Sequence, residues 1–134
     1  MTQTISIADP GPTPGAAELP FLDCERLDVY RVAVEFQTIA AGLCSRGRVG
    51  ALRDQLDRAS VSIVLNIAEG AGRRTRADKA HFFTIARGSA TECAAVLDLL
   101  SARGLVSPAD HRHGRDRLVR IVQMLTRLMA RHAS

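Results

Sequence analysis

Residues 52–73 read LRDQLDRASVSIVLNIAEGAGR, and this stretch decides the fold. Apolar side chains recur through it at three- and four-residue steps from Leu52 to Ile67, and charged side chains occupy positions between them. This period is typical of an amphipathic α-helix with one face in a core. Residues 62–68 are apolar nearly all round, so we expect neighbours to enclose them on several sides. Gly70 and Gly72 predict the end of this helix.

Three more helices are predicted on either side of this one. The first runs from about Cys24 towards residues 44–50, with apolar side chains at helical spacing. The third begins at the cap residue Thr75, carries two neighbouring apolar stripes, and ends at Gly104. Ser107 and Pro108 predict the start of the fourth, as cap and first helical residue. With short links and no strand-like alternation, residues 24–134 are expected to form an all-α, antiparallel up-down-up-down four-helix bundle.

Residues 1–23 differ in composition from the rest of the chain. They contain four of the five prolines, two glycines and no sustained apolar period. We therefore expect a flexible, disordered Pro/Gly-rich leader. The N-terminus lacks the basic start and apolar run of a secretion signal, and no apolar run reaches the roughly 20 residues that span a bilayer. These features predict a cytoplasmic protein with no membrane partner.

Two segments carry a resemblance to a known family: residues 55–73 and residues 81–92, HFFTIARGSATE. The matching positions are Ser62, Ile63, Asn66, Ile67, Ala68, Glu69, Gly70, Arg73, Phe82, Phe83, Ala86, Gly88, Ser89 and Glu92. The chain resembles the bacterial four-helix-bundle family first noticed as reading frames in intervening sequences of 23S rRNA genes. More distantly, it is similar to the accessory variability determinant proteins of diversity-generating retroelements. The resemblance covers about residues 24–132 and leaves the leader out.

The resemblance implies an architecture and a set of partners. It implies a four-helix protomer that assembles into a ring-like homopentamer with a basic surface. Members linked to retroelements bind nucleic acid and a reverse transcriptase, so RNA or DNA and a reverse transcriptase are the partners that it implies here.

Four polar residues in the matching segments form a candidate structural motif. Asn66 and Glu69 are three residues apart on one helix, and Ser89 and Glu92 have the same spacing on the next. Residues three apart are neighbours on a helix face, and a buried amide needs hydrogen-bond partners. We interpret the four as an interhelical hydrogen-bond network that fixes the register of the bundle. The alternative is a ligand or catalytic pocket built from the same residues.

The sequence disfavours the enzyme classes that a helical bundle supports. A ferritin-like metal site needs a Glu-x-x-His pair on each of two helices, but Glu69 is followed three residues later by Gly72 and Glu92 by Ala95. Phosphate-loop, zinc-protease and nucleophile motifs are missing. The three cysteines contain no CxxC pair and are expected to be reduced thiols. We predict no catalytic site, no metal and no cofactor.

Basic residues are the strongest binding feature. The formal net charge is +4, and Lys79 is the one lysine among 18 cationic residues. Two groups stand out as candidate phosphate contacts: Arg73, Arg74, Arg76 and Lys79 at the turn into the third helix, and Arg112, Arg115, Arg117 and Arg120 at the start of the fourth.

Each of these observations also has a plainer explanation. The arginine bias fits a GC-rich genome equally well. The basic turn can be a solvated turn in which Arg73 pairs with Glu69 or with a neighbouring subunit. The predicted function is a non-enzymatic, oligomeric scaffold that binds nucleic acid. The alternative is a self-assembling protein–protein interaction module with no nucleic-acid role.

Overall fold

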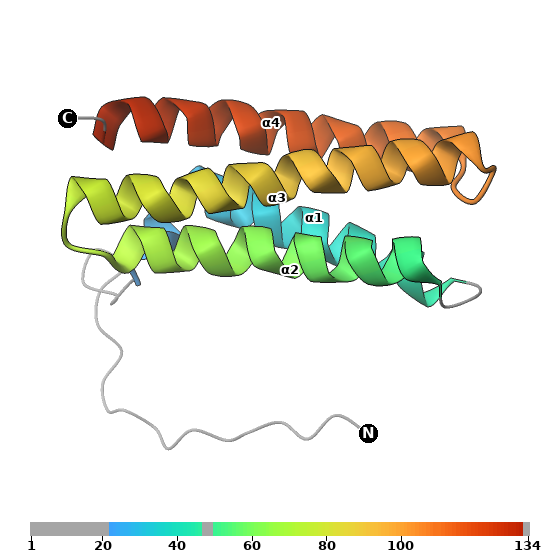
Figure 1. Cartoon of the computed structure of the whole chain (residues 1–134), viewed down its shortest axis with the longest axis horizontal. Coiled ribbons are helices and arrows are strands. Elements are labelled where there is room, and N and C mark those ends of the chain that lie inside the picture. The colour runs from blue at the N-terminus through green and yellow to red at the C-terminus, as the bar shows by residue number, and fades with distance from the viewer. Residues whose placement is uncertain (1–21, 47–49, 133–134) are drawn as a thin grey trace, which may run out of the picture.

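The computed structural model describes residues 22–46 and 50–132, so the predicted leader lies outside the described residues except for its last two positions. A 3-10 turn, η2, spans Asp23–Arg26, and four α-helices follow: α1 (Asp28–Ser45), α2 (Ala51–Gly72), α3 (Arg76–Ala102) and α4 (Pro108–His132). Each helix runs antiparallel to the one before it (Figure 1). The predicted all-α, up-down-up-down four-helix bundle is confirmed for the part of the chain that the structure describes.

Each helix packs against two neighbours. The contacting pairs are α1 with α2, α2 with α3, α3 with α4, and α4 with α1, while the described residues make no contact between α1 and α3 or between α2 and α4. The helices therefore occupy the corners of a square, with α2 and α4 diagonally opposed. One end of the bundle holds the start of α1, the α2–α3 turn and the C-terminal end of α4 (Figure 1).

The core is mostly aliphatic and fills the space between all four helices. Its largest fully buried side chains are Phe36, Phe83, Leu56, Ile63, Ile67, Leu97, Leu118, Ile121 and Leu125. On α3 the stripe from Phe83 to Leu97 is wholly buried, whereas the neighbouring stripe is buried only at Val96 and Leu100, and Ile85 is exposed. None of the described helices combines the length and the apolar character that crossing a membrane requires.

The last turns of α2 are less enclosed than their sequence predicts. Ile63 and Ile67 are fully buried, but Leu65 is 61% exposed and Val61 is 37% exposed. The elements α1, α3 and η2 all contact α2, so the expectation of neighbours on several sides is confirmed except on the outward side, at Leu65. No described helix covers that side, since α4 lies across the diagonal.

Gly70 has a different role from the predicted helix stop. α2 continues through it to Gly72, and its backbone conformation is not left-handed. A Cβ atom at Gly70 would lie 2.9 Å from Cε1 of Phe83 and 3.1 Å from Cβ of Phe82. The missing side chain therefore permits the close approach of α2 and α3. Gly88, by contrast, has open space around its Cβ position.

The predicted signals at the other helix ends are confirmed. The hydroxyl of Thr75 accepts a hydrogen bond from the backbone N–H of Asp78 at 3.1 Å, which caps α3. The hydroxyl of Ser107 does the same for Asp110 at 3.1 Å, and Pro108 is the first residue of α4. Gly104, with φ of 68°, makes the left-handed turn after α3.

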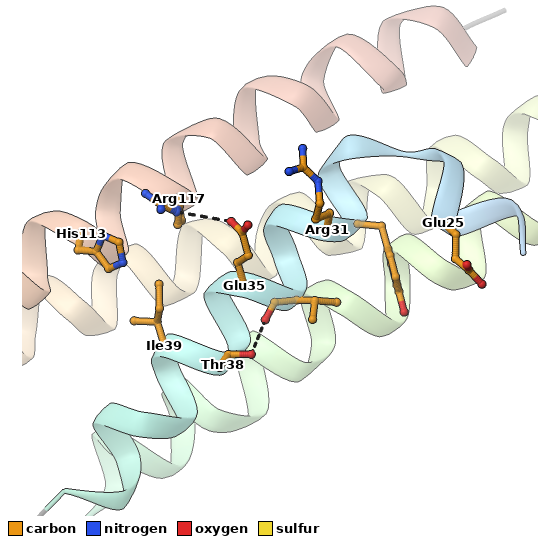
Figure 2. A pocket seen from close by; sticks show the side chains of 9 residues that line it. Glu25, Arg31, Glu35, Thr38, Ile39, His113 and Arg117 are labelled. Atoms are coloured by element: carbon orange, nitrogen blue, oxygen red, sulfur yellow. Dashed lines mark hydrogen bonds and ion pairs between the residues drawn. The ribbon is translucent and has the colours of Figure 1, made fainter. Parts of the chain in front are cut away.

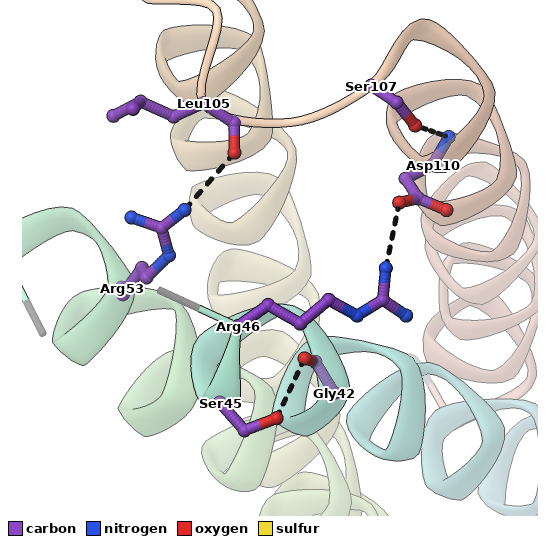
Figure 3. A network of polar contacts seen from close by, with 7 residues as sticks. All are labelled: Gly42, Ser45, Arg46, Arg53, Leu105, Ser107 and Asp110. Atoms are coloured by element: carbon purple, nitrogen blue, oxygen red, sulfur yellow. Dashed lines mark hydrogen bonds and ion pairs between the residues drawn. The ribbon is translucent and has the colours of Figure 1, made fainter. Parts of the chain in front are cut away.

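Polar contacts join the elements at the end of the bundle where α3 meets α4 (Figure 3). Arg46, just after α1, donates to the carboxylate of Asp110 on α4 at 3.3 Å. Arg53 on α2 donates to the backbone carbonyl of Leu105 in the α3–α4 link at 3.1 Å. Both arginines therefore act within the fold and connect separate elements at this end.

Candidate nucleic-acid interface

The link between α2 and α3 consists of three residues and places a run of cations at one end of the bundle. Arg73 and Thr75 have extended backbone conformations, with ψ of 154° and 151°, and Arg74 lies between them. All three are exposed, as is Arg76 at the first position of α3. A short link between antiparallel helices thus keeps three of the predicted phosphate-binding arginines close together.

Arg73 pairs within its own chain. Its guanidinium donates to the carboxylate of Glu69, one turn earlier on α2, and lies 4.7 Å from the ring centroid of Phe82. Such an i, i+4 pair and a cation–π contact each stabilise the folded chain slightly. The sequence leaves two ion-pair partners open for Arg73, namely Glu69 and a neighbouring subunit, and the structure shows the pair with Glu69.

Lys79 also serves the fold. Its ammonium group donates to the backbone carbonyl of Ala71 at 2.7 Å and reaches that of Gly70 at 3.5 Å. Carbonyls at the C-terminal end of a helix lack partners within the helix and carry the negative end of its dipole. Lys79, although it belongs to α3, therefore caps the C-terminus of α2.

Arg74 and Arg76 are the two cations of the turn that the fold does not use. Within the part of the chain that the structure describes, neither side chain makes an ion pair or a hydrogen bond. They stand at the N-terminus of α3, the positive end of the helix dipole, where cations are unfavourable and anions are favoured. Helix stability does not account for these arginines, whereas an external phosphate would satisfy them.

The end of α4 adds a cation, Arg131, that lies outside the two predicted groups of phosphate contacts. Arg131 and His132 are the basic residues in the last turn of α4, and the centroid of the His132 ring lies 6.0 Å from that of the Phe83 ring. Burial lowers the pKa of His132, and the positive charges of Lys79, Arg131 and Arg76 lower it further. Cations about fifty residues apart in the sequence therefore act on the same imidazole.

A groove at the same end adds two further arginines, Arg26 and Arg127. It has a volume of about 340 Å³, lies between the start of α1 and the end of α4, and is lined by Arg26, Arg127 and Arg131. Asp28 also lines it, but its carboxylate lies 3.8 Å from the guanidinium of Arg31. We call the following exposed residues the basic end: Arg26, Arg74, Arg76, Arg127 and Arg131.

The second predicted group lies elsewhere. Arg112, Arg115, Arg117 and Arg120 occupy the first half of α4, towards the opposite end of the bundle. Because α3 has 27 residues, the two ends are about 40 Å apart. The two groups therefore do not form one surface.

Two members of that second group are engaged within the fold. Arg115 donates to both carboxylate oxygens of Asp98 at 3.0 Å, and His111 makes a 2.8 Å hydrogen bond to the same carboxylate. The hydrogen bond from His111, helped by Arg115, holds the pKa of Asp98 below its usual range. Arg117 lies 3.7 Å from Glu35 on α1. Arg112 and Arg120 are exposed and make no ion pair with any described residue.

The predicted polar motif divides into three separate contacts. Asn66 donates to the backbone carbonyl of Ser62 at 2.9 Å and to its hydroxyl at 3.0 Å, and that hydroxyl bonds the hydroxyl of Ser89 at 2.9 Å. Ser62 is thus the residue that joins Asn66 to α3. Glu92 accepts from the amide of Gln55 on α2 at 2.7 Å. Glu69 pairs with Arg73 on its own helix instead.

A shallow pocket of about 590 Å³ lies between α1 and α4 (Figure 2). Tyr30, Val34 and Ile39 are among the apolar side chains that line it, and Glu35 and Arg117 face each other across it. The Nε of Arg117 is buried and makes no hydrogen bond to a described residue. The Arg117–Glu35 pair therefore links α4 to α1.

The thiols are placed for packing. Cys24 and Cys93 are buried, and burial raises the pKa of Cys93 to about 12, so its thiol stays protonated. Cys44 donates to the backbone carbonyl of Arg53 at 3.1 Å. Within residues 22–46 and 50–132, no three His, Cys, Asp or Glu side chains are grouped so that they could hold a metal ion.

Comparison with known proteins identifies a family and a similar solved fold. Residues 25–127 match the family described as 23S rRNA-intervening sequence protein. The crystal structure of a protein of unknown function from the S23 ribosomal protein family of Bacteroides thetaiotaomicron VPI-5482 is similar, with a TM-score of 0.72 and 22% sequence identity. The likeness covers 76% of this chain and 95% of that one, and at this identity it shows the fold alone. No curated protein matches the chain.

Proposed function

The chain belongs to the 23S rRNA-intervening sequence protein family, and we propose that it is a non-enzymatic, oligomeric scaffold that binds nucleic acid through its basic end. One observation carries the nucleic-acid part. Arg74 and Arg76 are exposed and unpaired within the described residues, at a helix N-terminus where cations destabilise the helix. A phosphate backbone supplies the anions that this arrangement favours.

The kind of binding follows from the side chains that are present. Arginine forks hold phosphates and position the protein, while base sequence is read by contacts to base edges. Among the described Phe and Tyr residues, Phe36 and Phe83 are buried, Phe82 lies against Arg73 and Tyr30 is partly buried in the pocket between α1 and α4, so they do not form an exposed stacking platform. Affinity should therefore depend strongly on salt and weakly on base sequence.

A double variant tests this proposal. Arg74→Gln with Arg76→Gln should weaken binding to unrelated duplex RNA and DNA alike, because the substitutions remove charges that face phosphates and leave base edges unaffected. Each phosphate that is no longer neutralised should reduce the slope of log affinity against log salt by about 0.9 on duplex DNA. Gel-shift titrations from about 50 to about 200 mM salt would measure both effects.

The matched control removes the same charge at the opposite end of the bundle. Arg46 and Arg103 are both exposed there, and Arg46→Gln with Arg103→Gln lowers the net charge equally. This control should bind more tightly than the test variant and keep a slope closer to that of the parent. Equal weakening in the two variants would mean that net charge, and not the basic end, governs binding.

The second candidate function is a self-assembling protein–protein interaction module. It is favoured by apolar side chains that a single chain leaves open, above all Leu65 at 61% exposure. Absence of binding by the parent to RNA and DNA at low salt would make this the better proposal. A reverse-transcriptase gene beside the coding sequence would instead support nucleic-acid binding.

A further inference from the structure

The outward face of α2 combines apolar and acidic side chains in one stripe. Asp54, Asp57, Val61 and Leu65 follow each other at three- and four-residue steps and are all exposed. Neither carboxylate makes an ion pair with a described residue, and the neighbouring Arg58 is held by a 2.8 Å hydrogen bond to Gln55. This stripe, Asp54 to Leu65, is called the α2 face.

Ile85 of α3 extends the apolar part of this face. The Ser62–Ser89 hydrogen bond and the contact of Gly70 with Phe82 set the antiparallel register of α2 and α3. In this register Ile85, which is 39% exposed, lies at about the same level along the bundle as Leu65. Val61, Leu65 and Ile85 are thus exposed apolar side chains on neighbouring helices, with the carboxylates of α2 at one end.

The seam between α3 and α4 has the opposite character. A groove of about 180 Å³ runs along it, with Ala90 and Ala94 on one wall and Leu118, Val119 and Val122 on the other. Almost all of its surface is apolar, and Val119 is 46% exposed. The small side chains of Ala90 and Ala94 leave the space open. We call this the α3–α4 groove.

The outer side of α4 beside the groove is basic. Arg112 and Arg120 are exposed and unpaired within the described residues, and Arg115 lines the groove itself. Asp116 is the one acidic residue among them. Although Arg115 is paired with Asp98, Arg112 and Arg120 give this side of the groove a charge opposite to that of the α2 face, and both surfaces have apolar side chains.

A chain cannot join these two surfaces to each other. α2 and α4 occupy diagonally opposite corners of the bundle and make no contact within the described residues. We propose that the α2 face of one copy packs into the α3–α4 groove of a second copy. The contact is heterologous, so repetition of it closes into a ring when the rotation between copies permits. This inference rests on the self-assembly part of the proposed function.

Single glutamate substitutions test each surface. Leu65→Glu would put a charge into the apolar groove of the next copy, and Val119→Glu would put one against the next copy's acidic face. Both sites are exposed in the single chain, so circular dichroism should show unchanged helicity. Light scattering of the full chain should find each variant reduced to a monomer at micromolar concentration.

Mixing the two variants is the decisive measurement. The Val119→Glu chain keeps an intact α2 face, and the Leu65→Glu chain keeps an intact groove. One good interface remains in the mixture, while the other would set two glutamates against each other. An equimolar mixture should therefore form a dimer with one copy of each chain, which neither variant forms alone.

The control and the contrary outcomes separate the two levels of the proposal. Val34→Glu changes a valine of similar exposure, 40%, on α1, which contributes to neither surface, and should assemble like the parent. If the parent is oligomeric but the variants still assemble, or if the mixture stays monomeric, the proposed pairing of these faces is wrong. Self-assembly itself is not contradicted by either result. A monomeric parent would overturn self-assembly and the pairing together.

Discussion

At the scale of single residues, Gly70 and Gly88 both lie within helices, but only Gly70 is closely surrounded by other side chains. Gly70 lies where α2 meets α3, and a Cβ there would be 2.9 Å from the buried ring of Phe83. Gly88 lies in the middle of α3 with nothing within 4 Å of its Cβ position. Both are among the residues that match the family pattern, but only Gly70 is required by contacts within the chain.

Gly70→Ala should therefore destabilise the protein. The ring of Phe83 is closely packed and has little room to move, so the added methyl group should cost about 1–3 kcal/mol in the free energy of unfolding. Urea denaturation followed by circular dichroism would measure it. Gly88→Ala is the control, and it should stabilise the helix by up to about 1 kcal/mol. Equal effects of the two substitutions would contradict the close-approach role of Gly70.

At the scale of elements, the C-terminus of α2 is capped by a side chain of α3. Lys79 donates to the last carbonyls of α2 across the three-residue link. The link also contains Thr75, whose hydroxyl caps α3. The turn between these helices is therefore stabilised from both sides, and Arg74 and Arg76 project from a well-ordered support.

Lys79→Met should lower stability while keeping the aliphatic part of the side chain. The hydrogen bond to a charged donor contributes about 1.5–3 kcal/mol, and its removal leaves the Ala71 carbonyl without this partner. The midpoint of chemical denaturation would report the change. Arg120→Met, at an exposed and unpaired position, should stay within about 0.5 kcal/mol of the parent. A Lys79→Met protein as stable as the parent would contradict the capping role of Lys79.

At the scale of the whole molecule, the cations of the basic end are separated in space from the exposed apolar side chains of the α2 face and the α3–α4 groove. The basic end collects cations from η2, the α2–α3 turn and the end of α4. The α2 face and the α3–α4 groove lie along the sides of the bundle. Assembly through the sides would leave the basic ends of all copies on one rim, where repeated weak phosphate contacts gain affinity by avidity.

The number of copies is a prediction taken from the family resemblance. Multi-angle light scattering in physiological salt should give a mass near five times the 14.5 kDa of one chain. A ring of this kind needs a heterologous contact, because a self-complementary contact closes at two copies. A stable dimer of the parent chain would thus contradict both the pentamer and the proposed pairing of faces.

The sequence by itself determined the helices and most of their ends. Thr75, Ser107 and Gly104 act through bonds to residues a few positions away, so their effect can be recognised from local spacing. The periodic apolar residues of residues 52–67 similarly identify the buried side of α2, since a helix has a fixed turn. The four-helix order follows from these elements and their short links.

Only the tertiary structure decided which polar and apolar side chains remain available. Lys79 donates to the carbonyls at the end of α2, and both Arg131 and Arg76 lie close enough to His132 to lower its pKa. Leu65 is exposed because α4 lies across the diagonal and no other described helix covers it. Each outcome depends on which helix lies beside which, and at what register. Those relations are set by packing between residues far apart in the chain, and the local sequence pattern does not contain them.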